Sequence, residues 1–127
     1  MSKKYKNIKR TDTFVEDFSN LRALTVYMRL TENEQKAIIA SVMKFDEDAE
    51  VYLFGSRVDD SEKGGDIDLL IKSDVMTNGI LYMLEDELFK YIDEQKVDFV
   101  LTGKSHLSNF ASMVLAKGAV KLCQRKN

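Results

Sequence analysis

The sequence predicts an α/β fold in which a small mixed sheet of about four strands is flanked by helices. Three observations lead to this prediction. The 127 residues are enough for one domain with a hydrophobic core of its own. Segments with the apolar spacing of helices alternate with short segments that are almost wholly apolar, and no segment repeats another. The chain has no proline and no glycine- or serine-rich stretch, so we expect no internal linker.

Composition and charge limit the classes of function. The formal net charge is -2, so the chain lacks the overall positive field that would hold a nucleic-acid backbone. The single cysteine, Cys123, excludes an internal disulfide and fits a reducing compartment. No apolar run is long enough to cross a bilayer, and the N-terminus lacks the apolar region of a signal peptide. We therefore expect a cytoplasmic protein that does not enter a membrane.

Residues 1–30 are predicted to form a basic tail followed by a helix. Lysine and arginine gather in the first ten residues, which offer little to bury and are interpreted as a solvated tail. A local contact with RNA or with an acidic partner is the alternative. Residues 12–29 carry apolar side chains every three or four positions, which predicts an amphipathic helix. Its apolar face could pack on the domain or on a partner.

A single domain is predicted over residues 31–123, with a polar tail at 124–127. Thr31 and Glu34 have the spacing of a capping box, so a helix begins there and runs to about Phe45. The remaining elements alternate in type along the chain. We expect strands at residues 51–54, 66–72, 96–101 and 119–123, and helices at residues 80–92 and 105–117.

Two of these elements carry further local signals. Ser105 is the expected N-cap of the last helix, and Gly118 is expected to close it. The strand at residues 66–72 contains an uninterrupted apolar run, Leu-Leu-Ile, which is typical of a strand that is covered on both faces.

That second strand begins with two carboxylates. Asp66 and Asp68 are two residues apart, and because successive strand side chains point to opposite faces, both project from the same face. Neighbouring anions beside a buried strand repel each other unless a cation lies between them. A third acid, Asp98, stands alone in the apolar third strand. If the second and third strands are neighbours, the three carboxylates converge, and their oxygens suit octahedral Mg²⁺.

Carboxylates arranged in this way can hold two metal ions about 4 Å apart. One metal would activate an attacking hydroxyl group, and the other would hold a triphosphate. Asp98 would bind the metal that faces the acceptor and help to take its proton. The alternative interpretation of Asp66 and Asp68, as a solvated strand end, agrees poorly with the buried run that follows them.

A Gly-Ser turn directly follows the first strand. Gly55 would let the backbone approach a phosphate closely, and Ser56 adds a hydroxyl donor to the backbone N–H groups of the turn. Arg57 would neutralise the β- or γ-phosphate, although a surface arginine is an equally good interpretation. The turn and the carboxylates together predict metal-assisted chemistry on a nucleoside triphosphate.

The spacing of these motifs resembles the signature of polymerase-β-like nucleotidyltransferases: Gly-Ser, nine further residues, then Asp-Ile-Asp. The resemblance covers about residues 31–122, and such a short chain is most similar to the minimal nucleotidyltransferases. It implies that residues 31–123 transfer a nucleoside monophosphate from a nucleoside triphosphate to an acceptor hydroxyl and release pyrophosphate. It also implies that the turn binds the triphosphate and that the three carboxylates hold the metals.

The chain departs from the family pattern directly after Arg57. Val58, Asp59 and Asp60 stand where the family often has another small or basic residue and a glycine, and the added acids could weaken binding of the triphosphate. Gly65 stands where serine is frequent, which should be harmless.

Minimal nucleotidyltransferases lack an acceptor-binding domain of their own. This chain is similar to the antitoxins of two-gene modules whose toxin is a small helical HEPN ribonuclease. The resemblance implies that AMP is transferred from ATP to a tyrosine of that toxin, which silences it. Two other functions stay open: transfer to a small molecule, and neutralisation of a partner by binding alone. A homo-oligomer is compatible with all three.

Overall fold

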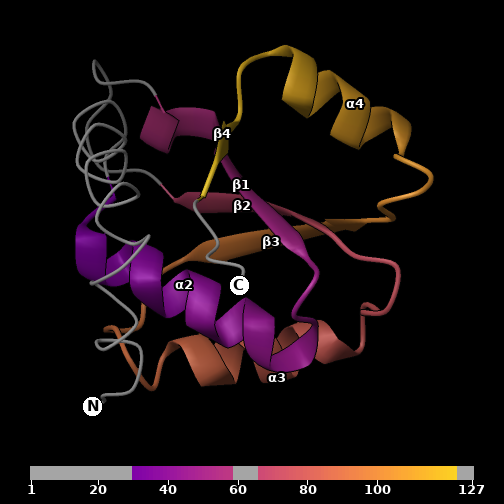
Figure 1. Cartoon of the computed structure of the whole chain (residues 1–127). Helices are drawn as coiled ribbons and strands as arrows, with labels where there is room; N and C mark the ends of the chain where they lie inside the picture. The colour runs from indigo at the N-terminus through magenta and orange to yellow at the C-terminus, as the bar shows by residue number, and fades with distance from the viewer. Residues whose placement is uncertain (1–29, 59–65, 123–127) are drawn as a thin grey trace, which may run out of the picture.

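A computed structural model describes residues 30–58 and 66–122 of the chain (Figure 1). The predicted tail and helix before residue 30 lie outside the described residues, as do Cys123 and the tail at residues 124–127. The boundaries predicted for the terminal segments therefore stay predictions. None of the helices in the described part is long and apolar enough to cross a membrane.

Helices and strands alternate along the chain, as expected for an α/β protein. The strands pair in the order β3-β2-β1-β4. β1 is antiparallel to β2 and to β4, whereas β2 and β3 are parallel, so the sheet is mixed. The predicted fold class is thereby confirmed. The elements are α2 (Glu32–Phe45), β1 (Glu50–Phe54), the 3₁₀ turn η2 (Gly55–Val58), β2 (Ile67–Lys72), α3 (Ile80–Leu88), β3 (Val97–Thr102), α4 (Asn109–Ala116) and β4 (Val120–Lys121).

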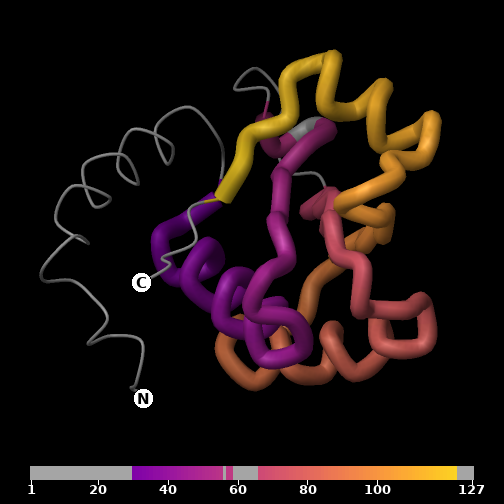
Figure 2. Tube along the Cα trace, turned by 45° about the vertical axis from the view of Figure 1, so that its right-hand side comes forward, coloured from indigo at the N-terminus to yellow at the C-terminus, as the bar shows by residue number. Residues whose placement is uncertain are grey.

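The sheet separates two layers of helices. α2 and α3 cover one face, and α4 covers part of the other (Figures 1 and 2). β2 is central and is buried on both sides: Leu69 and Ile71 belong to the core under α2 and α3, whereas Leu70 packs with Ala111 and Val114 of α4. This arrangement confirms that the apolar run of the second strand is covered on both faces.

The start of α2 confirms the predicted capping box. The Glu34 N–H donates to Thr31 Oγ1 at 3.0 Å, and the Thr31 N–H donates to Glu34 Oε1 at 3.0 Å. Both bonds satisfy N–H groups that have no partner inside the helix.

Two predicted helix boundaries are wrong. Ser108, not Ser105, caps α4, and its hydroxyl accepts from the Ala111 N–H at 3.0 Å. Ser105 is engaged elsewhere, because its hydroxyl and its N–H both donate to the carboxylate of Asp74. α3 ends at Leu88 rather than at residue 92, and the chain continues in tighter turns.

Candidate active site

β2 and β3 bring the three predicted carboxylates together. In the parallel register, Asp68 of β2 lies directly beside Asp98 of β3. Asp66 immediately precedes β2 and lies two residues before Asp68, so it projects to the same side. This is the face on which Leu70 contacts α4. The predicted convergence depended on the two strands being neighbours, and they are.

A lysine that the sequence analysis did not consider lies among these acids. Lys96 Nζ is 3.3 Å from Asp66 Oδ2 and 3.3 Å from each carboxylate oxygen of Asp98. The ammonium group therefore supplies the cation that neighbouring carboxylates require. A signal for this contact was present in the sequence, because Lys96 is two residues before Asp98 and so shares its strand face.

The carboxyl group of Asp68 has a raised pKa. Its partial burial raises the pKa of its carboxyl group above the ordinary value, and the charges of Asp98 and Asp66 raise this pKa further. The charge of Lys96 acts against these effects and lowers the pKa of Asp68. The pKa of Lys96 is itself raised, by its hydrogen bonds to Asp98 and Asp66. Asp68 therefore binds a proton more readily than an isolated aspartate would.

The raised pKa of Asp68 predicts how stability depends on pH. Protonated Asp68 stabilises the fold; this contribution is complete below its ordinary pKa of 3.8 and is lost as the pH rises through the higher pKa of the folded state. We therefore expect Asp68→Asn to be more stable than the wild type at pH 7 without metal, and the difference to shrink as the pH falls toward 4. Urea unfolding in the presence of a chelator would measure it.

Asp74→Asn is a control for this experiment, and we expect it to change the stability at pH 7 in the opposite direction. Hydrogen bonds from Ser105 lower the pKa of Asp74, so its contribution is present at neutral pH and is lost as the pH falls. Asp74→Asn should therefore be less stable than the wild type at pH 7. This difference in stability should also shrink as the pH falls. Equal pH profiles for Asp68→Asn and the wild type would contradict the electrostatic assignment of Asp68.

The Gly-Ser turn lies against the carboxylate strand. Gly55 directly follows β1 and has φ +80°, a conformation that residues other than glycine rarely adopt. A Cβ atom at Gly55 would overlap Asp68 Oδ2 and would lie 3.2 Å from Asp68 Cγ. The backbone of the turn therefore adjoins the acid cluster, where a phosphate and a metal ion would have to meet. Ser56 follows in η2, and its side chain lies outside the described part of the structure.

Arg57 points to the start of α2 and to the segment before β3. Its Nη2 donates to Gln95 Oε1 at 3.3 Å, and its Nη1 is 3.8 Å from Glu34 Oε1. The side chain is only 15 % exposed. These contacts fix the guanidinium group, and its predicted role as a phosphate ligand stays a prediction.

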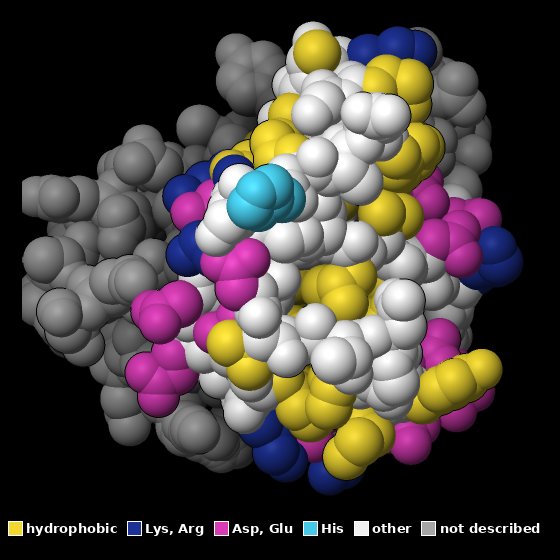
Figure 3. All heavy atoms as spheres, turned by 90° about the vertical axis from the view of Figure 1, so that its right-hand side faces the viewer, with side chains coloured by type: hydrophobic (Ala, Val, Ile, Leu, Met, Phe, Trp, Pro, Cys, Tyr) yellow, Lys and Arg dark blue, Asp and Glu magenta, His cyan; other side chains and the backbone are white. Residues whose placement is uncertain are grey.

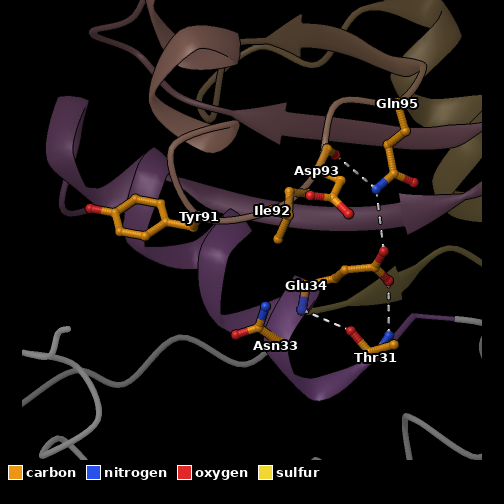
Figure 4. Close-up of a pocket in the computed structure, with 7 residues that line it drawn as sticks. All are labelled: Thr31, Asn33, Glu34, Tyr91, Ile92, Asp93 and Gln95. Carbon is orange, nitrogen blue, oxygen red and sulfur yellow. Dashed lines mark hydrogen bonds between the residues drawn. The ribbon is translucent and has the colours of Figure 1, made fainter.

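The same two partners of Arg57 line an open hollow of about 280 Å³ (Figure 4). Gln95 Nε2 bridges Glu34 Oε2 and the backbone carbonyl of Asp93, each at 3.4 Å. The carboxylates in this lining make it a poor site for a triphosphate, and none of the acid cluster lines it. The full lining is Thr31, Asn33, Glu34, Tyr91, Ile92, Asp93 and Gln95.

Apolar surface lies on the carboxylate side of the sheet. Phe54 pairs in register with Asp68, and its ring meets that of Phe110 on α4 edge to face, with 6.0 Å between centroids. Phe110 is 45 % exposed, and Leu107 and Met113 near it are also exposed. Figure 3 shows apolar side chains at the surface of the side of the molecule on which α4 lies. A ligand or partner that reaches the carboxylates would find an apolar contact next to them.

The donor atoms are of the chemical type that hard divalent cations prefer. They are carboxylate oxygens from adjacent strand starts, and the side chains of Asp66 and Asp98 are 46 % and 49 % exposed, so both water and a metal can reach them. Among residues 30–58 and 66–122, no group of three or more histidine, cysteine, aspartate or glutamate side chains is arranged so that it could hold a metal ion. The ammonium group of Lys96 lies between Asp66 and Asp98, at the position where a cation would neutralise both carboxylates.

Comparison with known proteins agrees with this geometry. A search of curated proteins found no match. The family model described as a nucleotidyltransferase domain matches residues 36–121, well over half of the chain. Enzymes of this family generally use a nucleoside triphosphate and divalent metal ions. The chain therefore belongs to the nucleotidyltransferase domain family and is a transferase of nucleoside monophosphates.

Proposed function

We propose that this protein transfers AMP from ATP to a hydroxyl group of a protein partner, and that the partner is a small helical toxin of the HEPN class that the transfer silences. The observation that carries the chemistry is the convergence of Asp66, Asp68 and Asp98 beside the turn at Gly55, within a domain of the nucleotidyltransferase family. The protein would act in the cytoplasm as an antitoxin.

The exposed side of the cluster supports a protein acceptor. Among the described strands, β3 pairs only with β2, so Asp98 lies on the edge strand of the sheet. Its side chain is 49 % exposed, and a hydroxyl group on the surface of another protein can approach it from solvent. The apolar side chains of Leu107, Phe110 and Met113 on and before α4 would contact that protein next to the reacting groups.

In the proposed reaction, Asp66, Asp68 and Asp98 would hold Mg²⁺, and backbone N–H groups of the turn at Gly55 and Ser56 would bind the phosphates. When bound, Mg²⁺ supplies the positive charge that activates the hydroxyl group and neutralises the triphosphate. Asp98 accepts the proton of the acceptor hydroxyl. The hydroxyl oxygen forms a bond to the α-phosphorus, the bond from that phosphorus to the bridging oxygen breaks, and pyrophosphate leaves.

A labelling experiment tests this proposal. The purified protein is mixed with Mg²⁺, the product of the neighbouring gene, and ATP labelled at either the α- or the γ-phosphate. We expect α-label and a mass gain of AMP on a tyrosine of the partner, no transfer of γ-label, and loss of the signal in Asp66→Ala. Asp74→Ala, which removes an exposed acid outside the cluster, should label normally.

The other outcomes favour the two alternative functions. Tight binding of ATP and Mg²⁺ without label on the partner would favour a small-molecule acceptor. If nucleotide does not bind and Asp66→Ala still neutralises the toxin, the protein acts by contact alone.

A further inference from the structure

We propose that Lys96 is a resident counter-cation of the active site, which holds the carboxylates together before nucleotide arrives and is displaced when a divalent metal binds. Lys96 would thereby weaken the binding of metal by the nucleotide-free protein. This inference rests on the metal site of the proposed function and adds a residue that competes for it.

The contacts of Lys96 are those that a metal ion would take. Its Nζ lies 3.3 Å from Asp66 Oδ2 and 3.3 Å from both oxygens of Asp98, so one positive charge bridges two of the three proposed ligands. A metal ion that binds the same oxygens must replace these three contacts. The ammonium group and the metal therefore exclude each other at Asp66 and Asp98.

The backbone of Lys96 is fixed, whereas its side chain is free to leave. The Ile67 N–H donates to the Lys96 carbonyl at 3.1 Å, which ties the residue to the first position of β2. The Lys96 side chain is 65 % exposed, and its long apolar stem lets the ammonium group swing into water without moving the strand. Displacement by a metal therefore requires no rearrangement of the sheet.

A displaced ammonium group would remain beside the site, where a bound triphosphate adds negative charge. Lys96 would then pair with the nucleotide instead of with the carboxylates. The competition with metal is thus strong without nucleotide and weak with it, and metal and nucleotide would bind cooperatively. The protein would take up its metal together with the triphosphate rather than beforehand.

The test measures Mn²⁺ binding by the loss of the electron paramagnetic resonance signal of free Mn²⁺. We expect Lys96→Met to bind Mn²⁺ about three- to tenfold more tightly than the wild type in the absence of nucleotide, the range expected for two exposed ion pairs. With a saturating non-hydrolysable ATP analogue, measured against the same analogue without protein because the analogue itself binds Mn²⁺, the difference should shrink or reverse. Lys96→Arg, which keeps the charge, should resemble the wild type.

Lys90→Met is the matched control. Lys90 Nζ pairs with Glu87 at 3.1 Å and its side chain is 63 % exposed, so it resembles Lys96 in exposure and contact but lies outside the cluster. Its Mn²⁺ affinity should equal that of the wild type. If Lys96→Met does not fold, as judged by circular dichroism, Lys96→Gln replaces it.

The outcomes separate this inference from the proposed function. Equal or weaker Mn²⁺ binding by folded Lys96→Met, with clear binding by the wild type, overturns the role of Lys96 and leaves the metal site intact. No Mn²⁺ binding by any of the proteins, with or without the ATP analogue, overturns both.

Discussion

Replacing Asp68 with asparagine is expected to lower nucleotidyl transfer by about a thousandfold or more while the fold is kept. Loss of a direct metal ligand should exceed the 10- to 100-fold effect of removing a group that only supports a ligand. Asp68 lies beside Asp98 in register and against Gly55, so it would join the proposed metal and phosphate parts of the site. Pyrophosphate release from ATP in the presence of the partner would measure the rate.

Asparagine is the informative replacement because it preserves shape and removes charge. The packing of Gly55 against the side chain stays, so a lost rate cannot be attributed to a collapsed turn. Asp66→Ala and Asp98→Ala should also abolish transfer, and Asp74→Asn should not. Near-wild-type transfer by Asp68→Asn, Asp66→Ala or Asp98→Ala would remove that residue from the metal site.

Gly55→Ala is expected to destabilise the protein by about 2–5 kcal/mol. A non-glycine residue in the left-handed region costs about 1–2 kcal/mol, and forcing a methyl group into a filled space typically costs a further 1–3 kcal/mol. Gly55 has φ +80°, and its added Cβ would overlap Asp68 Oδ2. Urea unfolding in the absence of metal would measure the change.

The chain contains a control that separates the two costs. Gly118 has φ +109°, but an added Cβ there would meet nothing within 4 Å, so Gly118→Ala should show the backbone cost alone, about 1–2 kcal/mol. Combining Gly55→Ala with Asp68→Ala should relieve the overlap and give a coupling energy of about 1–2 kcal/mol. Equal costs at Gly55 and Gly118, with no coupling, would refute a tight contact between turn and strand.

The parts of the fold that depend on local spacing could be predicted from the sequence. The capping box at Thr31 and Glu34, the apolar runs of the strands and the alternation of elements are visible within short windows. The N-cap of α4 could not be predicted in this way, because Ser105 and Ser108 are both good caps. The choice is made by Asp74, which is remote in sequence and bonds Ser105.

For the candidate site, too, local spacing could be predicted from the sequence and contacts between strands could not. The positions of Asp66 and Asp68 on one face follow from strand periodicity alone. The registers that pair Asp68 with Asp98 and bring Gly55 against Asp68 are contacts between strands, which no short window contains. Lys96 was missed because a lysine before a strand has no special meaning until the strand beside it is known to carry acids.

The edge position of β3 has a consequence for local opening of the sheet. β3 is held by β2 on one side, and it is preceded by Lys96 and contains Asp98, so a molecule in which this edge detaches loses one acid and the counter-cation together. Asp66 then loses its ion pair with Lys96, whereas Asp68 is relieved of the nearby charge of Asp98, so the two effects on the free energy of the open form oppose each other. The ion pair between Lys96 and Asp66 therefore favours reclosure of β3, and the repulsion between Asp68 and Asp98 favours its opening.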